Sequence, residues 1–289
     1  MAKVTAALVK QLREMTDSPM MECKKALVEA DGDIEKAVDV LRKMGVAKAV
    51  KRAGRDTNEG TVAAYVSEDG KQGALLELTC ETDFVGTNPK FVGFAKDLAK
   101  VVAEENPADA EALKACKMGE STVADELTEM IHGIGENMKI ARFQRITADN
   151  GALAAYIHLG GKLGDIVSFS FEKPETAQND EFKTFAHDVA MQVAAAAPVA
   201  ARREDVPAET IEHEKGIYMA QAAESGKPEA IQERIANGKL EKFYKEVVLT
   251  EQVFIKDSNT TISELAKKVG KAAGDTITIN GFARFNFGE

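Results

Sequence analysis

Apolar residues recur every three or four positions through the first 45 residues, which is the spacing of amphipathic helices. In the first predicted helix they are Val4, Ala7, Leu8 and Leu12. A second helix is expected to begin at Ser18 as its N-cap, with Pro19 in the first turn, where a missing N–H costs nothing. Its apolar face consists of Cys23, Leu27 and Ala30. Met20 and Met21 stand at the start of this helix, and we expect a small bundle not to bury both.

The third predicted helix lies between two glycines. Gly32 can end the second helix and Asp33 can cap the third, which is expected to end before Gly45. Its inward positions are Ile34, Ala37, Val38 and Leu41. Three short helices within about 45 residues predict a compact bundle near the lower size limit for independent folding.

A basic run follows the bundle. It consists of Lys48, Lys51, Arg52 and Arg55, with no acidic residue before Asp56. The run is short and lacks the interleaved aromatic side chains of a nucleic-acid site, so we interpret it as a solvated linker between domains.

The rest of the chain repeats itself at a constant offset. Tyr65 corresponds to Tyr156, an offset of 156 − 65 = 91 residues. At the same offset Ala63-Ala64 corresponds to Ala154-Ala155, Gly70-Lys71 to Gly161-Lys162, Gly73 to Gly164, and Phe91, Phe94, Ala95 and Asp97 to Phe182, Phe185, Ala186 and Asp188. So many identities without a gap indicate a duplicated unit. Each copy begins with the pattern of a β-hairpin, and a helix follows it.

Each copy closes with a further strand, and the second copy carries an insertion before it. The closing strands contain Ala141-Arg142-Phe143 and Ala283-Arg284-Phe285, an offset of 283 − 141 = 142, which leaves 142 − 91 = 51 additional residues in the second copy. The insertion has the pattern of a helical hairpin: a helix from Pro207 to Ala222, a turn at Ser225-Gly226-Lys227-Pro228, then Ile231, Ile235 and a stop at Asn237-Gly238. Such an arm either contacts another chain or packs on its own domain, and the sequence leaves both open.

These patterns predict an α+β protein with three parts. Residues 1–55 form an N-terminal three-helix bundle plus the basic linker, residues 56–149 a first α+β core subdomain, and residues 150–289 a second, related subdomain. Each subdomain is expected to contain an antiparallel three-stranded sheet, and the helical hairpin is inserted at about residues 199–257.

Charge and cysteine content favour a protein partner over a nucleic acid. The 289 residues carry a net charge of −10, whereas a protein that grips phosphate backbones needs clustered Lys and Arg in excess. Cys23, Cys80 and Cys116 are isolated and odd in number, which argues against a disulfide framework and implies a reducing compartment. Without a signal-peptide pattern or an apolar stretch long enough to span a membrane, a cytoplasmic location is expected.

The most unusual stretch is Thr82-Asp83-Phe84-Val85, which follows an apolar run, Leu75–Cys80, that predicts a strand. A phenylalanine at a surface turn either folds back under the loop as a core residue or is held out for contact. At the offset of 91 its segment corresponds to Lys173-Pro174-Glu175-Thr176, which offers no counterpart to the ring. The repeated fold therefore does not require Phe84, and this favours a loop specialised for contact.

The sequence shows no constellation typical of an enzyme. The four histidines, His132, His158, His187 and His213, have no paired metal-ligand spacing, and neither a G-x-x-x-x-G-K-[ST] phosphate loop nor a G-x-S-x-G elbow occurs. Glu77, Glu81 and Asp83 could be an acid/base group, but an alternating strand places such residues on one solvated face far more often. We therefore predict a binding protein with no cofactor and no metal.

Several motifs resemble those of the elongation factor Ts family, and together they span nearly the whole chain. They are Leu12-Arg13, Met20-Met21-Glu22-Cys23-Lys24-Lys25-Ala26-Leu27, Ala30-Asp31-Gly32-Asp33, Thr82-Asp83-Phe84-Val85, Ile134-Gly135-Glu136-Asn137 and Ser225-Gly226-Lys227-Pro228. The resemblance implies a ubiquitin-associated-like bundle, a core of two related α+β subdomains and an inserted coiled-coil hairpin. It also implies a guanine-nucleotide exchange factor for elongation factor Tu, which acts in translation elongation.

The resemblance further implies a mechanism. The factor binds Tu·GDP, and the loop of Thr82, Asp83, Phe84 and Val85 pushes Asp83 and Phe84 toward the Mg2+ site of Tu. Mg2+ and GDP are then held less tightly, GDP leaves and GTP rebinds. Arg13, Met20 and Met21 match family positions that dock on the same Tu domain as the 82–85 segment. His158 matches a family position that touches another Tu domain.

The expected partner is elongation factor Tu, both GDP-bound and nucleotide-free, and a two-to-two assembly is left open. Neither a membrane nor direct nucleic-acid contact is expected. Longer family members continue beyond the last strand into a C-terminal helical module that also touches Tu, whereas this sequence stops at Phe287-Gly288-Glu289, so the resemblance does not extend to that contact. The alternative is an RNA- or ribosome-associated binding protein that uses the run from Lys48 to Arg55.

Overall fold

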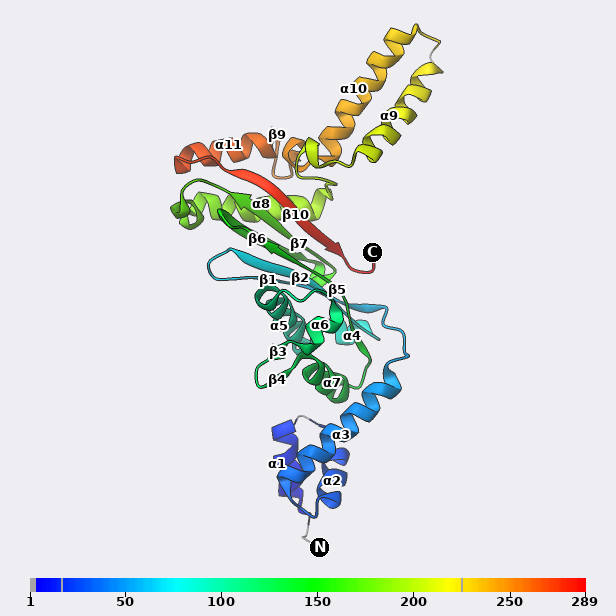
Figure 1. The fold of residues 1–289 in the computed structure, drawn as a ribbon, viewed down its shortest axis with the longest axis vertical. Coiled ribbons are helices and arrows are strands. Elements are labelled where there is room, and N and C mark those ends of the chain that lie inside the picture. The colour runs from blue at the N-terminus through cyan, green and yellow to red at the C-terminus, as the bar shows by residue number, and fades with distance from the viewer. Residues whose placement is uncertain (1–3, 17, 225) are drawn as a thin grey trace. The chain divides into compact units, whose positions relative to one another are not determined.

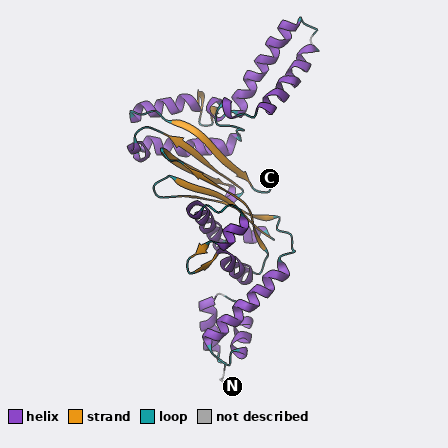
Figure 2. Cartoon of the chain, in the orientation of Figure 1, coloured by secondary structure: helices purple, strands orange, loops and turns teal. Residues whose placement is uncertain are grey.

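The computed structural model describes residues 4–16, 18–224 and 226–289 (Figure 1). Runs of helices and runs of strands follow one another along the chain (Figure 2), and the sheets are small, which confirms the α+β class. The chain divides into two compact units, one built mainly from the residues up to 63 and from 76–143, the other mainly from 64–75 and 144–287. Among the described residues, no helix is long and apolar enough to cross a membrane.

The three N-terminal helices share one small buried core. They are α1 (Ala6–Thr16), α2 (Met20–Glu29) and α3 (Ile34–Arg52). The buried core consists of Val9, Leu12, Cys23, Ala26, Leu27, Ala30, Ala37 and Leu41. Ala7 was predicted to face inward but is exposed, because Val9 takes the inward position on α1.

The caps of the bundle match the prediction at one helix and not at the other. Asp33 accepts a hydrogen bond from the N–H of Lys36 at 3.1 Å, so it caps α3 as expected. The prediction that Ser18 caps α2 is wrong. Pro19 has an extended backbone (φ −56°, ψ 136°) and occupies the N-cap position, so the helix starts at Met20. Ser18 is buried instead.

Helix α3 does not end at Gly45, contrary to the prediction. It continues to Arg52, and Gly45 is buried inside it. A Cβ atom at position 45 would lie 3.4 Å from Cγ of His132, which belongs to α7 (Val123–Ile134). The glycine lets α3 approach α7 closely, and this packing outweighs the roughly 1 kcal/mol that glycine costs within a helix. The side chains of Lys48 and Lys51 are therefore presented from a helix, not from a loop.

The first sheet has the strand order β1-β2-β5. Its strands are β1 (Glu59–Val66), β2 (Gln72–Cys80) and β5 (Met138–Thr147). Between β2 and β5 lie α4 (Asp83–Gly86), α5 (Pro89–Glu105), α6 (Ala110–Ala115), β3 (Lys117–Met118), β4 (Ser121–Thr122) and α7. The predicted closing strand Ala141-Arg142-Phe143 lies in β5, directly after α7.

The second sheet has the order β10-β7-β6, and both pairings are antiparallel. Its strands are β6 (Gly151–His158), β7 (Leu163–Ser170) and β10 (Thr278–Asn286). Helices α8 (Asp180–Ala196) and α11 (Ile262–Ala273) lie along one face of it (Figure 1). The core between the sheet and these helices contains an aromatic cluster, in which Phe169 meets Phe182 and Phe185 edge-to-face with ring centroids 5.6 and 5.7 Å apart.

The same helix caps recur along the chain. Asn88 caps α5 and Asn179 caps α8, an offset of 179 − 88 = 91, and the left-handed C-caps Asn106 and Ala197 have the same offset. Thr122 and Thr261 each close a capping box, before α7 and α11 respectively. These caps fix where each helix begins and ends relative to its sheet.

The segment predicted as an insertion contains two helices, which lie side by side (Figure 2). They are α9 (Ala208–Ala223) and α10 (Glu229–Val247). The predicted stop at Asn237-Gly238 is wrong, because α10 passes through Gly238 and its Ala236 is fully buried. Of the predicted turn, Ser225 lies outside the described residues. The remaining short elements are η1 (Leu159–Gly161), η2 (Pro174–Gln178), η3 (Arg203–Asp205), η4 (Leu249–Glu251), β8 (Val253–Phe254) and β9 (Asp257–Thr261).

Candidate functional site

The segment Thr82–Val85, called the 82–85 loop below, lies where β2 ends. Thr82 is extended (φ −127°, ψ 155°), and the single helical turn α4 begins with Asp83. Asn88 then caps α5 by accepting from the N–H of Lys90 at 2.9 Å, and Pro89 occupies the first turn of that helix. The loop is therefore a short, capped turn between a strand and a long helix.

Within this turn the two apolar side chains point in opposite directions. Val85 is buried, at 8% exposure, whereas Phe84 is 83% exposed. Gly86 is buried too, because a Cβ there would lie 3.1 Å from the carbonyl oxygen of Gly60. Val85 and Gly86 seat the turn on the core, and this leaves the ring of Phe84 outside. The interpretation of Phe84 as a core residue is excluded.

A groove of about 560 Å3 opens beside the exposed ring. Phe84 and Val85 form one wall, and Met130, Gly133 and Ile134 at the end of α7 form another. Thr16, the last residue of α1, also lines it. The groove thus brings together the 82–85 loop, α7 and the N-terminal bundle.

The acidic residues near the loop do not share a solvated face, contrary to the sequence interpretation. Glu77 is buried and accepts from Nε of Arg142 at 2.9 Å. Glu81 is half-buried and accepts from the N–H of Asn137 at 2.6 Å. Only Asp83 is exposed. Each carboxylate therefore has a different role, and only that of Asp83 remains open to a partner.

Arg13, Met20 and Met21 lie on the surface of the bundle. Met20 is 54% and Met21 63% exposed, and Arg13 is exposed on α1. An exposed pair of methionines at a helix start is a soft apolar surface that adapts to a partner.

The next residue, Glu22, joins the bundle to α7. Its carboxylate forms an ion pair with Lys48 and lies 3.3 Å from Nε2 of His132. Burial lowers the pKa of His132, and Glu22 opposes this effect, so the imidazole is neutral at pH 7.

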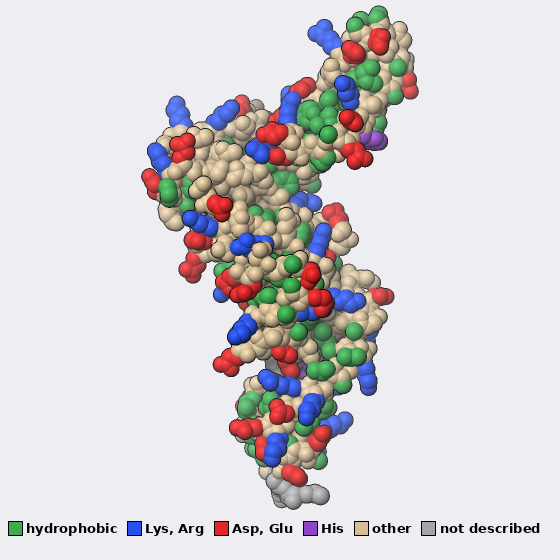
Figure 3. Space-filling model, viewed as in Figure 1, with side chains coloured by type: hydrophobic (Ala, Val, Ile, Leu, Met, Phe, Trp, Pro, Cys, Tyr) green, Lys and Arg blue, Asp and Glu red, His purple; other side chains and the backbone are tan. Residues whose placement is uncertain are grey.

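The run Lys48–Arg55 is not a free linker. Besides the Lys48–Glu22 pair, Arg52 donates to the carbonyl oxygen of Ile131 at 3.2 Å, and Arg55 donates to Glu81 at 3.3 Å. Figure 3 shows Lys and Arg interspersed with Asp and Glu on the visible surface. Three of the four basic side chains of the run are thus committed to intramolecular contacts.

His158 lies at the end of β6, in the other unit from the 82–85 loop. Its ring stacks on Tyr156 with centroids 5.7 Å apart, and its Nδ1 lies 3.0 Å from the Tyr156 hydroxyl. Leu159 follows with a left-handed backbone (φ 49°) and is 71% exposed. His158 is thereby oriented on the surface beside an exposed apolar residue.

Sequence reasoning missed the residues that hold the 82–85 loop in place, above all Glu136. The motif Ile134-Gly135-Glu136-Asn137 belongs to the family resemblance, but the local pattern predicts no role for it. A signal was present, because Gly135 marks a helix end and a carboxylate follows it directly. Among the described residues, no group of three or more His, Cys, Asp or Glu is placed to hold a metal ion.

Comparison with known proteins identifies the family. The family model described as "Elongation factor TS" matches residues 81–289. "Elongation factor Ts" of Clostridium perfringens (strain SM101 / Type A) is 47% identical over 287 residues, which cover 99% of this chain and 93% of the relative. The proteins of the same name from Trichlorobacter lovleyi and Desulfovibrio desulfuricans are each 46% identical, over 99% and 98% of this chain and 93% and 98% of the relatives. The chain therefore belongs to the elongation factor Ts family, the factors that act in the elongation stage of protein synthesis.

Proposed function

We propose that this protein is the guanine-nucleotide exchange factor of elongation factor Tu: it binds Tu·GDP, weakens the hold on Mg2+ and GDP, and lets GTP rebind. The observation that carries the proposal is the ring of Phe84, 83% exposed on a capped turn beside a groove. Family membership supports the same role in elongation.

In this proposal Phe84 acts as a wedge and Asp83 as a charge. Burial of apolar surface is favourable by roughly 25 cal/mol of free energy per Å2. Insertion of the exposed ring into an apolar slot of Tu therefore stabilises the complex. Asp83 brings a carboxylate next to it, which can reorganise polar groups that otherwise support the metal ion. Neither step forms a covalent bond, so the protein acts on the GTPase without a reaction of its own.

Thermodynamic linkage relates the affinities of Tu for GDP and for the exchange factor. If its binding weakens the affinity of Tu for GDP by some ratio, GDP weakens the affinity of Tu for the factor by the same ratio. Incoming GTP then displaces the factor. The factor changes the rate of exchange and leaves the final equilibrium between GDP and GTP on Tu unchanged.

The remaining contacts are proposed from the positions of side chains. Arg13, Met20 and Met21 are exposed on the bundle, and Thr16 of the same helix as Arg13 lines the groove beside Phe84. They dock on the Tu domain that receives the ring. His158, fixed by Tyr156, contacts a second Tu domain, and a two-to-two assembly of the chains belongs to the same proposal.

The proposal extends to the layout of the chain. The bundle is ubiquitin-associated-like, and the two sheets with their helices are related subdomains, of which the second carries the coiled-coil hairpin α9–α10. The recurring caps support this relation, since Asn88 and Asn179 keep the offset of 91 seen in the sequence.

The alternative, an RNA-binding protein that uses residues 48–55, has less support. Lys48, Arg52 and Arg55 contact groups of the protein itself, so they are not free to neutralise phosphates. RNA binding that falls steeply with salt and survives removal of the 82–85 loop would favour this alternative.

Release of a fluorescent GDP from purified Tu tests the proposed function. Catalytic amounts of this protein should accelerate release by orders of magnitude, and excess GDP should dissociate the complex in a pull-down. An unchanged release rate would reject the exchange role. Binding to Tu that GDP does not weaken would contradict the reciprocal mechanism.

Met20→Glu should raise the dissociation constant for nucleotide-free Tu about tenfold, because a charge replaces an apolar contact that is desolvated in the complex. Most of the change should appear in the dissociation rate, as is usual for interface substitutions. Surface plasmon resonance measures both. Val50→Glu is the matched control, since Val50 is 70% exposed on α3 of the same bundle and is assigned no contact. Equal effects of the two variants would refute the docking role of Met20.

A further inference from the structure

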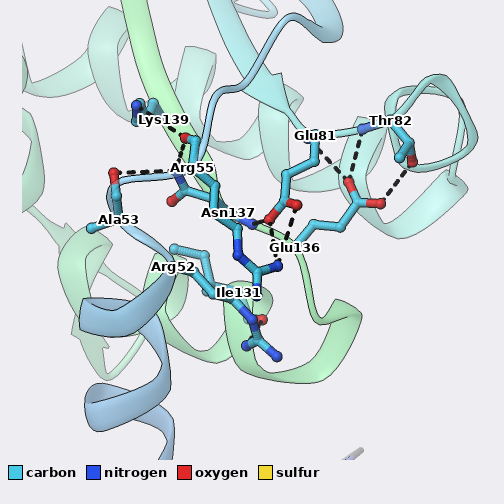
Figure 4. A network of polar contacts seen from close by, with 9 residues as sticks. All are labelled: Arg52, Ala53, Arg55, Glu81, Thr82, Ile131, Glu136, Asn137 and Lys139. Atoms are coloured by element: carbon cyan, nitrogen blue, oxygen red, sulfur yellow. Dashed lines mark hydrogen bonds and ion pairs between the residues drawn. The ribbon is translucent and has the colours of Figure 1, made fainter.

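A polar network that the wedge mechanism does not use surrounds the start of the 82–85 loop (Figure 4). Glu136 accepts hydrogen bonds through one oxygen from the N–H groups of Glu81 and Thr82, at 3.1 and 3.0 Å. Its other oxygen accepts from the hydroxyl of Thr82 at 2.7 Å. Both oxygens of one carboxylate therefore hold the two residues that immediately precede Asp83 and Phe84.

Glu136 is itself held rigidly. It follows Gly135, which ends α7 in a left-handed conformation (φ 93°), a backbone that glycine adopts without strain. Helix α7 is anchored by buried Leu127 and Ile131. The backbone from which the carboxylate of Glu136 extends is thus fixed by the end of a packed helix.

The network extends to the segment that leaves the N-terminal bundle. Glu81 accepts from the N–H of Asn137 at 2.6 Å and from Arg55 at 3.3 Å. The amide of Asn137 donates to the carbonyl oxygens of Arg55 and Ala53, at 2.8 and 3.4 Å. Asn137 is buried, so its side chain needs these protein partners in place of water. The start of the loop, the end of α7 and the chain leaving α3 are therefore tied at one point (Figure 4).

The second sheet contains a comparable carboxylate. Asp275 follows Gly274, the left-handed C-cap of α11, and accepts from the N–H groups of Glu172 and Lys173 at 3.1 and 2.9 Å. These two donors correspond to Glu81 and Thr82 at the offset of 172 − 81 = 91. Thr176 adds a hydroxyl bond to Asp275 at 2.6 Å. The same kind of clamp thus occurs twice, but only the first clamp precedes an exposed aromatic ring.

We propose that Glu136 is the positioning residue of the exchange loop: its carboxylate fixes Glu81 and Thr82 so that the ring of Phe84 is presented already ordered. The inference rests on the proposed exchange function and deepens it. Bonds to an ionised carboxylate are among the stronger hydrogen bonds in proteins. A loop that is ordered before binding loses less conformational freedom when it inserts, which favours the wedged state.

Kinetics with Tu supply the first test. Glu136→Ala should lower the maximal rate of GDP release about tenfold. The concentration of factor that gives the half-maximal rate should change by a smaller ratio, because the contacts of the bundle with Tu remain. Glu136→Gln should recover most of the rate, since its amide oxygen can accept from both N–H groups and its NH2 can donate to the Thr82 hydroxyl. Asp275→Ala is the matched control, and its exchange rate should stay within about twofold of wild type.

Fluorescence of the free protein supplies the second test, without Tu. The chain contains no tryptophan, so Phe84→Trp introduces a single reporter at the exposed position. Time-resolved anisotropy should show a larger fast component when Glu136→Ala is added, and no change when Asp275→Ala is added. The positioning role would be overturned if Glu136→Ala and Asp275→Ala slowed exchange equally. It would also be overturned if Glu136→Ala left the anisotropy unchanged. If the wild-type protein fails to accelerate GDP release, the proposed function fails, while the anisotropy still decides whether Glu136 orders the loop.

Discussion

Phe84→Ala should slow the stimulated release of GDP from elongation factor Tu by roughly 30-fold or more, with little change in the protein's own melting temperature. The kinetic effect follows from truncating a ring that enters a partner, which typically costs about 2 kcal/mol or more, and each 1.4 kcal/mol is a factor of ten. Stability should change by less than about 0.5 kcal/mol, because the side chain is 83% exposed and leaves no cavity in the core. Stopped-flow release of a fluorescent GDP and a thermal melt measure the two effects.

Two further variants make the test of Phe84 specific. Phe84→Leu keeps part of the apolar volume and should fall between alanine and wild type. Val253→Ala removes another exposed apolar side chain, 51% exposed on β8, and should leave exchange unchanged. Full exchange activity of Phe84→Ala would reject the wedge. A large drop in its melting temperature would contradict the exposed position of the ring.

Asp165→Asn should stabilise the protein at pH 8 and remove a pH dependence of its stability. Asp165 lies on β7, opposite Tyr156 of β6 and Arg284 of β10. It is fully buried, and neither of its oxygens has a hydrogen-bond partner among the described residues. Burial raises the pKa of Asp165 to about 8, and the positive charge of Arg284 only partly opposes this effect.

The sign of the pH effect follows from the two protonation states. Between about pH 4 and 8 the unfolded chain has lost the Asp165 proton and the folded chain keeps it, so stability falls as the pH rises through this window. A pKa raised by about four units sets an upper limit of roughly 5 kcal/mol, and relaxation near Arg284 makes about 1–3 kcal/mol a realistic expectation. Urea unfolding at pH 5.5 and 8 measures the change. The prediction would be contradicted if the stability of the wild type relative to Asp165→Asn rose between pH 5.5 and pH 8. It would also be contradicted if Asp165→Asn were less stable than the wild type at pH 8.

The pKa of Asp275 is shifted in the opposite direction from that of Asp165, so the same unfolding experiment should give the opposite pH dependence. Hydrogen bonds from the Thr176 hydroxyl and the backbone N–H of Lys173 lower the pKa of Asp275 to about 2. Its contribution to stability is therefore present at neutral pH and is lost as the pH falls toward that value. Asp275→Asn should destabilise the protein at pH 7 and lose its effect in acid, whereas Asp165→Asn has its largest effect in alkali.

The sequence predicted those features that depend on local spacing. The apolar faces of the bundle, the start of α9 after Pro207 and the closing strands around Arg142 and Arg284 follow from periodicity and turn residues. The exposure of Phe84 was also predictable, because the repeat showed that its counterpart segment does without a ring.

Features that depend on distant packing were not predictable in this way. The local pattern predicts helix ends at Gly45 and Gly238, but α3 packs against His132 and α10 packs along α9, so both helices continue. Glu81 and Glu136 are 55 residues apart, and no spacing rule shows that both hold the same turn. Their roles emerge only when Gly135 turns the chain back toward β2.

The doubled carboxylate clamp has a consequence for how such a protein can evolve. Because Glu136 and Asp275 each secure the end of a strand, exposed side chains that follow the strand, such as Phe84, are freed from maintaining the fold. One connection can then carry a recognition loop while the other serves the fold, as Thr176 does through its bond to Asp275. A strand end that is anchored in this way can be followed by different loops. Exchanging the loop residues that follow Glu81-Thr82 with those that follow Glu172-Lys173 is therefore a route to factors with altered partners.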